Sequence, residues 1–270
     1  MTKTSAYLNL IRFYNPIGFW LLLWPGLWGL FLSNNFNIEN FTIVVLGSFL
    51  TRSLGCAIND FLDRDFDKNV ERTKNRPIAS KNLSLTEAGI FIVILASICV
   101  FLLMQTNPYT IKLVCYVAIP MIVVYPLMKR FLAMPQLFLG ATFGLSLPIS
   151  YSIAESSINL EVIFLYLGCI FWIIAYDTYY ALCDIEDDRK LNLNSSAIFF
   201  GNDTQKAIIL FSLLFLGVVM LFALKNSSFL LGVGAVFLIY QIYFQNKLSN
   251  LNKNLDAFKA NSHIGLIIAI

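Results

Sequence analysis

Clustered carboxylates at two places in the chain carry the chemistry that the sequence suggests. Asp60, Asp63 and Asp67 follow one another at spacings of three and four residues, at the end of an apolar run that begins near Phe41. If a helix continues through these residues, they share one face. Such a density of negative charge beside lipid is costly unless a cation compensates it. This stretch therefore predicts a cation-binding site at the end of a membrane helix.

A second acidic cluster repeats this arrangement. Asp184 and Asp188 lie four residues apart, directly after the apolar run 160–182. Mg²⁺ prefers oxygen ligands and commonly bridges a few carboxylates to phosphate oxygens. Two carboxylate pairs at equivalent helix ends predict one Mg²⁺ site that holds a pyrophosphate. In such a site the metal and nearby basic groups neutralise the charge that develops when pyrophosphate leaves carbon.

Basic side chains near the two clusters are candidates for binding that pyrophosphate. They are Arg64, Lys68, Arg72, Arg76, Lys129, Arg130, Arg189 and Lys190. Arg52 and Asp177 fall inside apolar segments, where ionisable residues usually face a polar cavity. The alternative for charged loops is pairing at the membrane interface and attraction to anionic lipid. Two matching clusters favour the metal site over this alternative.

The elements that position these residues are membrane helices. The chain of 270 residues is 58% hydrophobic and 13% charged, and its long apolar blocks are typical of a polytopic membrane protein in a lipid bilayer. The sequence predicts an all-α bundle of about nine transmembrane helices that forms a single domain over residues 1–270. The predicted helices are 14–32, 41–60, 87–105, 109–127, 136–153, 160–182, 205–224, 228–244 and 258–270.

The distribution of Lys and Arg predicts the orientation of the bundle. All but three of the 19 Lys and Arg residues fall on one side of the predicted helices; Lys112 and Lys225 lie on the other side, and Arg52 lies within a helix. By the positive-inside rule, both acidic clusters face the cytoplasm. A net charge of +3 without an Arg-rich stripe gives no indication of a nucleic-acid partner. Nothing in the sequence points to an obligate protein partner.

Several motifs resemble those of the UbiA-type intramembrane prenyltransferases. Asn59-Asp60-x-x-Asp63-x-x-x-Asp67 resembles the first aspartate-rich motif of that family, and Asp184-x-x-x-Asp188 resembles the second. The stretches 21–25, 72–77, 125–130 and 176–181 are similar to the 4-hydroxybenzoate polyprenyltransferase branch. The resemblance covers nearly the whole chain. It implies a location in the bacterial inner membrane, or in the mitochondrial inner membrane of a eukaryote.

The resemblance also implies roles for individual residues. The residues implied to hold Mg²⁺ and the pyrophosphate of a polyprenyl donor are Asn59, Asp60, Asp63, Asp67, Asp184 and Asp188, and those implied to contact the pyrophosphate are Arg64, Arg72 and Arg76. Lys129 or Arg130 would bind the carboxylate of 4-hydroxybenzoate, and Asp177 would orient or polarise its phenol. The implied product is 3-polyprenyl-4-hydroxybenzoate, formed by attack of the ring carbon ortho to the hydroxyl, in ubiquinone biosynthesis.

Two departures and three alternatives accompany this resemblance, and one departure is a C-terminal helix that is short for the family. Asp65 adds an acid inside the first motif, where the branch often has a basic or neutral residue. Another aromatic acceptor, such as a naphthoate, homogentisate or haem ring, is the nearest alternative. Inward carboxylates also suit a cation-coupled transporter, although acids at helix ends beside basic loops favour phosphate chemistry. A membrane scaffold without catalysis is the third alternative.

Overall fold

The computed structural model describes residues 2–68 and 73–265, and within these ranges the chain forms helices and no strand. The α-helices are α1 (Lys3–Leu10), α2 (Ile17–Phe31), α3 (Ile38–Leu62), α4 (Arg64–Asp67), α5 (Leu85–Leu103), α6 (Pro108–Leu113), α7 (Ile119–Phe131), α8 (Pro135–Gly144), α9 (Ser146–Glu155), α10 (Leu160–Lys190), α11 (Ser196–Phe200), α12 (Thr204–Lys225), α13 (Phe229–Asn250) and α14 (Asn254–Lys259). The all-α prediction is therefore confirmed.

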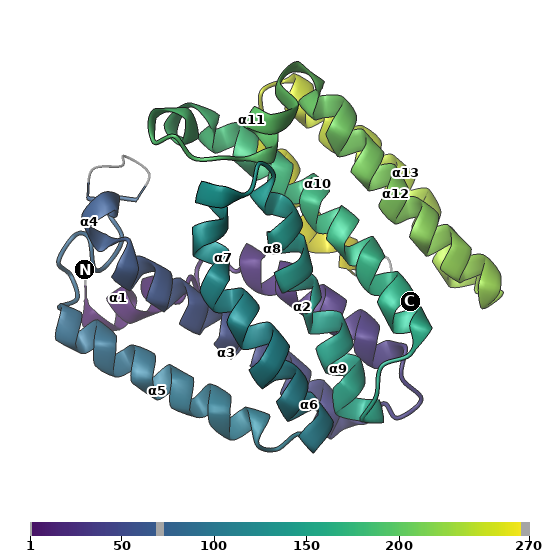
Figure 1. Ribbon diagram of the computed structural model, residues 1–270, viewed down its shortest axis with the longest axis horizontal. Helices are drawn as coiled ribbons and strands as arrows, with labels where there is room; N and C mark the ends of the chain where they lie inside the picture. The colour runs from purple at the N-terminus through teal and green to yellow at the C-terminus, as the bar shows by residue number, and fades with distance from the viewer. Residues whose placement is uncertain (1, 69–72, 266–270) are drawn as a thin grey trace.

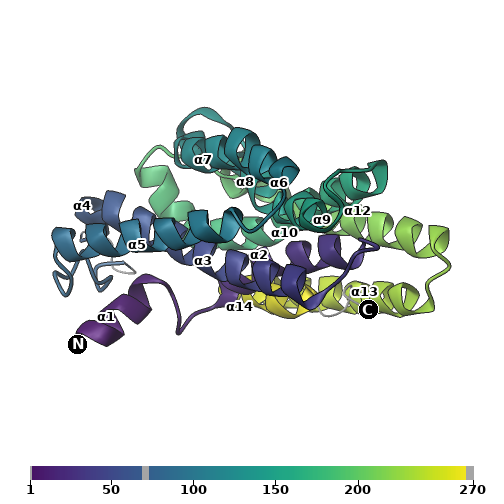
Figure 2. The same cartoon turned by 90° about the horizontal axis from the view of Figure 1, so that it is seen from below.

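Helix α10 lies at the centre of the bundle (Figure 1). It packs against α8 and α9 and, on its other side, against α12. Helix α2 packs against α9 and α3, and α3 packs against α5. Figure 2 shows α6 and α7 on the opposite side of the bundle from α1 and α14. The core between these helices is aromatic and aliphatic, with Trp28, Trp172 and Ile173 at most 3% exposed.

Seven helical segments of the described residues are long and apolar enough to cross a membrane, and α2 is a shorter apolar helix. An integral membrane bundle is thus confirmed, whereas the predicted count of nine spans is not. Of the predicted helices, 258–270 differs most from the structure. In its described part, α14 ends at Lys259 and a 3₁₀ turn continues to His263; residues 266–270 lie outside the described residues. Within this turn Asn261 is buried and accepts a 3.0 Å hydrogen bond from Trp172 Nε1.

The predicted helix 109–127 contains a π-helical turn. This turn, Val114–Ala118, joins α6 to α7, and the Ile119 N–H donates to the Val114 carbonyl five residues earlier. Pro120 follows at once and has no N–H to donate to the carbonyl four residues before it. A shifted hydrogen-bond register is therefore favourable here. It fixes the direction in which α7 carries Tyr125 and Lys129 toward the acidic end of the bundle.

The segments that bear the two acidic clusters lie toward the same side of the bundle. Figure 1 shows α4, which carries Asp67 of the first cluster, at the left of the view and α11, which follows the second cluster, at the top, whereas the turn between α12 and α13 lies at the right. That the two clusters form one site stays a prediction.

Gly29 allows α2 and α9 to approach closely. A Cβ at this position would overlap the Leu147 carbonyl oxygen and Ser150 Oγ. We expect Gly29→Ala to lower the free energy of unfolding by about 1–3 kcal/mol, because overpacking against a backbone atom forces the helices apart. Thermal unfolding in detergent measures this change as a lower midpoint.

Gly55→Ala on α3 is the matched control, because no atom lies within 4 Å of a Cβ placed at Gly55. This variant is expected to unfold at or above the temperature of the unmodified protein, since Ala is the better helix former. Equal midpoints for the two variants would contradict the close packing of α2 on α9.

Candidate active site

The first acidic cluster lies where α3 ends. Helix α3 stops at Leu62, Asp63 forms its C-cap, and the short helix α4 begins at Arg64. The condition for a shared face, one helix continuing through Asp60, Asp63 and Asp67, is therefore not met. The break at Asp63 still brings two of the carboxylates inside, because Asp60 is 1% and Asp67 is 5% exposed. Asp63 remains an exposed side chain at the break.

Two arginines neutralise the buried carboxylates. Arg76 Nη1 lies 2.9 Å from Asp67 Oδ2 and 3.2 Å from Asp60 Oδ1. Arg12 Nη2 donates to Asp60 Oδ1 at 2.5 Å. Arg12 has a φ of +60°, which residues other than Gly rarely adopt. This conformation of the segment between α1 and α2 places Arg12 beside the cluster.

The other basic residues predicted to act at this cluster do not contact its two buried carboxylates in the described part of the chain. Arg64 Nη1 donates to the Phe61 carbonyl at 2.9 Å, and Arg64 Nη2 lies 3.5 Å from Asp65. Among the described residues, Arg64 thus turns toward the exposed acid and away from the buried pair. Asp65 also accepts a 2.8 Å hydrogen bond from Lys68, which explains the additional acid in the motif. Arg72 lies outside the described residues.

The second cluster lies on an unbroken helix. Helix α10 continues through Asp184 and Asp188 to Lys190, eight residues beyond the predicted end, so these two acids share a face as predicted. Asp188 is 4% exposed, and its Oδ1 lies 3.7 Å from Lys129 Nζ on α7. The Arg130 side chain is exposed. Lys129 and Arg130, the two basic residues predicted to bind substrate here, therefore differ: Lys129 lies beside Asp188, and Arg130 is exposed.

Each cluster contains one buried carboxylate oxygen suited to a metal. Asp60 Oδ2 and Asp188 Oδ2 are buried and have no hydrogen-bond partner among the described residues. Carboxylate oxygens of this kind are the ligands that hard divalent cations prefer. Within residues 2–68 and 73–265, no three acidic, Cys or His side chains already form a metal-binding group. The donor set fits a divalent cation, and the two orphan oxygens belong to different helices.

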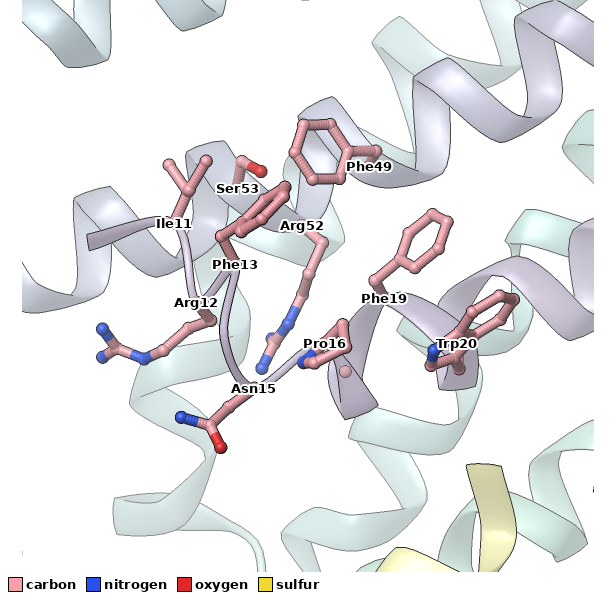
Figure 3. A pocket seen from close by; sticks show the side chains of 11 residues that line it. Ile11, Arg12, Phe13, Asn15, Pro16, Phe19, Trp20, Phe49, Arg52 and Ser53 are labelled. Carbon is pink, nitrogen blue, oxygen red and sulfur yellow. The ribbon is translucent and has the colours of Figure 1, made fainter. Parts of the chain in front are cut away.

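A cavity of about 310 Å³ lies beside the first cluster, between the segment 11–16, α2 and α3. Its walls include Phe13, Phe19 and Phe49, and its charged groups are Arg12 and Arg52. Figure 3 shows Arg52 extending from α3 toward Pro16. Arg52, an ionisable residue within a membrane helix, thus faces a cavity, but the walls of this cavity are mainly aromatic and apolar rather than polar as expected.

Gly18 makes room for the Arg52 guanidinium. A Cβ at Gly18 would overlap three atoms of that group. The Arg52 guanidinium carbon also lies 5.8 Å from the centre of the Phe143 ring on α8, within the range of a cation–π contact. The cation is thus held between aromatic faces inside the bundle.

Asp177 on α10 faces the same region as Arg52. Both side chains lie close enough to the Tyr125 and Tyr176 hydroxyls to interact electrostatically with them. Gln136 on α8 accepts a 2.8 Å hydrogen bond at its Oε1 from the backbone N–H of Ser196 at the start of α11. Arg52 and Asp177, which carry opposite charges, therefore act on the same two tyrosine hydroxyls. These four side chains make a polar region inside the bundle, next to the aromatic cavity.

Sequence reasoning missed two residues of this site. Arg12 stands just before the first apolar segment, where a single basic residue has no spacing pattern to distinguish it. Gln136 opens the predicted helix 136–153, and a lone amide at a helix start is usually solvent-facing. Only the fold brings Arg12 to Asp60 and Gln136 to the backbone N–H of Ser196.

These features define a class: a polytopic helical membrane protein with two carboxylate clusters at one end and a cationic, aromatic cavity beside them. The family model described as the UbiA prenyltransferase family matches residues 22–266. The chain belongs to this family. Membership favours prenyl transfer over cation-coupled transport and over a scaffold role.

Curated relatives agree with this family. A 4-hydroxybenzoate octaprenyltransferase of Polynucleobacter asymbioticus is 43% identical over 97% of this chain and 92% of its own length. One of Francisella tularensis subsp. novicida is 41% identical over 99% of this chain and 96% of its own length. Both similarities extend over almost the full length of either protein.

Solved structures share the fold. A UbiA homologue from Aeropyrum pernix K1, in its apo form, has a TM-score of 0.80 at 22% identity, over 92% of this chain and 94% of its own. A UbiA homologue from Archaeoglobus fulgidus bound to GPP and Mg²⁺ has a TM-score of 0.71 at 18% identity, over 98% of this chain and 100% of its own. The fold of this chain is therefore that of the UbiA intramembrane prenyltransferases.

Proposed function

We propose that this chain transfers a polyprenyl group from polyprenyl pyrophosphate to carbon 3 of 4-hydroxybenzoate and releases pyrophosphate, as a single domain over residues 1–270. The observation that carries the proposal is the 41–43% identity, over nearly the whole chain, to relatives named 4-hydroxybenzoate octaprenyltransferase. In this reaction the allylic carbon–oxygen bond breaks and a carbon–carbon bond forms ortho to the phenol. The ring then loses a proton. The product would serve ubiquinone biosynthesis.

The carboxylate clusters are the proposed pyrophosphate end of the site. Asp60 and Asp188 each present a buried oxygen without a hydrogen-bond partner among the described residues, so they are the leading candidates to hold Mg²⁺. When bound, Mg²⁺ supplies neutralisation of the charge that builds on the leaving pyrophosphate. The further proposed ligands are Asn59, Asp63, Asp67 and Asp184. That a UbiA homologue from Archaeoglobus fulgidus is bound to GPP and Mg²⁺ supports the use of a divalent metal.

Basic residues at both clusters are the proposed partners of the pyrophosphate oxygens. Arg12 and Arg76 already contact the first cluster, and Lys129 lies at the second. Their positive charges stabilise the leaving group without any reorganisation of solvent. Arg64 and Arg72 remain candidates that rest on the family resemblance alone.

Arg52 is the proposed partner of the acceptor carboxylate, in place of Lys129 or Arg130. It is the charged group that reaches into the bundle beside Phe13, Phe19 and Phe49. A benzoate ring is flat, apolar and anionic at one end, which matches aromatic walls around one guanidinium. Asp177, which interacts electrostatically with the same tyrosines as Arg52, is the proposed acceptor of a hydrogen bond from the acceptor hydroxyl.

The proposed orientation places the acidic end of the bundle toward the cytoplasm of a bacterial inner membrane. Lys and Arg gather at that end, and the positive-inside rule assigns such loops to the cytoplasm. A water-soluble acceptor and pyrophosphate would then enter and leave from the cytoplasm, while the polyprenyl chain stays in the bilayer.

Mg²⁺ affinity is expected to fall as the pH is lowered, and the fall should begin at a higher pH than an ordinary aspartate would give. Partial desolvation and the neighbouring carboxylate of Asp67 raise the pKa of Asp63 above its usual value. A protonated carboxyl does not ligate a metal, so Asp63 must lose its proton when Mg²⁺ binds. Isothermal titration with Mg²⁺ at several pH values measures this linkage. Asp63→Asn should flatten the pH dependence, and an unchanged slope in that variant would remove Asp63 from the site.

An acceptor panel tests the proposed reaction. Membranes that contain the expressed chain are incubated with octaprenyl pyrophosphate, Mg²⁺ and one of three acceptors: 4-hydroxybenzoate, 1,4-dihydroxy-2-naphthoate or homogentisate. Mass spectrometry of the lipid extract is expected to show a 3-prenylated product from 4-hydroxybenzoate alone. Product from another ring only would keep the family and refute the proposed acceptor.

A further inference from the structure

The Arg52 guanidinium is a cation inside the bundle that has no acidic partner among residues 2–68 and 73–265. In that part of the chain it forms no ion pair and no hydrogen bond, and the centre of the Phe143 ring lies 5.8 Å from its central carbon. Arg12, the other cation of the cavity, is paired with Asp60. A cation within a membrane bundle that has only an aromatic face beside it favours an anionic ligand. The cavity therefore attracts anions through Arg52 rather than through Arg12.

Gly18 determines where this cation lies. It is the second residue of α2, it is buried, and it lines the cavity. A Cβ at Gly18 would lie 2.4 Å from Arg52 Nε, 2.6 Å from Nη2 and 2.7 Å from Cζ. All three distances are far shorter than a van der Waals contact. The guanidinium thus lies against the backbone of α2, in the space that the side chain of any other residue at this position would fill.

The overlap expected at Gly18 differs in kind from the one at Gly29. At Gly29 the nearest atom is the carbonyl oxygen of Leu147, which is part of the backbone and moves only with its helix. At Gly18 the three nearest atoms belong to the far end of one flexible side chain, that of Arg52. The guanidinium can change rotamer while α2 and α3 keep their packing. A methyl group added at Gly18 is therefore expected to displace the cation and to leave the fold intact.

We propose that Gly18 is a positioning residue for the aromatic acceptor: because it has no side chain, the Arg52 guanidinium can lie against α2 and face the acceptor carboxylate. A guanidinium binds both oxygens of a carboxylate in one planar geometry, so its position decides whether the pair forms. This inference rests on the proposed function, because it assumes that Arg52 binds that carboxylate. Gly18 contributes no group to the acceptor, and its effect reaches the acceptor through the place of one cation.

Gly18→Ala is expected to raise KM for 4-hydroxybenzoate about 10-fold, because a guanidinium displaced by about 1 Å no longer meets both carboxylate oxygens. KM for octaprenyl pyrophosphate and the midpoint of thermal unfolding should stay close to those of the unmodified protein. Isothermal titration with 4-hydroxybenzoate measures the same loss without turnover. An unaltered KM for 4-hydroxybenzoate would overturn the inference. So would a midpoint lowered as far as that of Gly29→Ala, because the helices rather than the guanidinium would then have moved.

A double-mutant cycle with Arg52→Leu tests the route of the effect. Leucine lacks the three atoms that a Cβ at Gly18 would overlap. If Gly18 acts through Arg52, Gly18→Ala causes no further rise in KM for 4-hydroxybenzoate in the Arg52→Leu background. Additive rises would overturn the positioning role, and so would an unaltered KM in Arg52→Leu alone. If the unmodified protein prenylates no acceptor, the proposed function fails, and this inference fails with it; normal prenylation with additive rises refutes the inference alone.

Gly47→Ala is the matched control for a methyl group added to a helix glycine near the cavity. Gly47 lies on α3, the helix that carries Arg52, and a Cβ there would lie 3.7 Å from Leu102 Cδ2, an ordinary contact. This variant is expected to keep both KM values of the unmodified protein. An equal rise in KM for 4-hydroxybenzoate in Gly18→Ala and Gly47→Ala would mean that any added methyl group disturbs the cavity, which would overturn the inference.

Discussion

Asp60→Asn is expected to lower the rate of Mg²⁺-dependent prenyl transfer at least about a hundredfold. Asp60 is 1% exposed, its Oδ1 pairs with Arg12 and Arg76, and its Oδ2 has no hydrogen-bond partner among the described residues. Asparagine keeps the size of the side chain and removes the charge that a divalent cation needs. The substitution also leaves Arg12 and Arg76 beside a neutral amide instead of a carboxylate.

The loss should appear in activity more than in folding. The Arg12 side chain is 26% exposed and that of Arg76 is 21% exposed, so water still solvates both guanidinium groups after their shared partner becomes neutral. We therefore expect a well-folded variant with weak Mg²⁺ binding. Isothermal titration with Mg²⁺, beside the kinetic assay on the same sample, separates a lost metal from a lost fold.

Asp65→Asn is the control for Asp60→Asn. Asp65 lies in the same acidic stretch, but it is exposed and pairs with Lys68 and Arg64 at the surface. Exposed pairs of this kind contribute little to stability. Activity and Mg²⁺ affinity should stay close to those of the unmodified protein. A similar loss in both variants would mean that general acidity of the stretch, rather than the buried oxygen of Asp60, holds the metal.

Arg52→Gln is expected to raise KM for 4-hydroxybenzoate about 10- to 100-fold, while KM for octaprenyl pyrophosphate changes little. The Arg52 guanidinium is the charged group that extends from α3 into the aromatic cavity. A charge-assisted pair with the acceptor carboxylate would be lost in this variant. Steady-state kinetics with each substrate varied in turn measures the two KM values separately.

Arg130→Gln distinguishes this assignment from the one favoured by sequence. Arg130 ends the segment that resembles the 4-hydroxybenzoate branch, yet its side chain is exposed in the structure. If Arg52 binds the carboxylate, Arg130→Gln leaves KM for 4-hydroxybenzoate unaltered. A larger rise in Arg130→Gln than in Arg52→Gln would restore the assignment made from the sequence.

Most of the bundle and the polar ends of its helices follow from the sequence. Long apolar blocks determine where membrane helices lie, and acids at their ends stand out because charge beside lipid is costly. The pairing of Asp184 and Asp188 was predictable, since helical spacing within an unbroken α10 is a local property. The break at Asp63 was not predictable, because the ends of helices are the least certain feature of a sequence pattern.

The contacts that complete the site depend on packing between distant segments. Arg12 reaches Asp60 across 48 residues of sequence, and Gln136 meets Ser196 across 60. Neither residue has a periodic or charge-based signal that marks its partner. The predicted helix 258–270 is likewise interrupted in its described part by a 3₁₀ turn, in which buried Asn261 contacts Trp172 from a distant helix.

The most direct test of this account measures prenylated product and pyrophosphate in one reaction of the purified chain with octaprenyl pyrophosphate and 4-hydroxybenzoate. With Mg²⁺ present, the account predicts equal amounts of 3-octaprenyl-4-hydroxybenzoate and pyrophosphate, and neither when EDTA replaces the metal. Product formed equally well in EDTA would contradict the metal-dependent site. Pyrophosphate released without any prenylated ring would contradict the transfer itself.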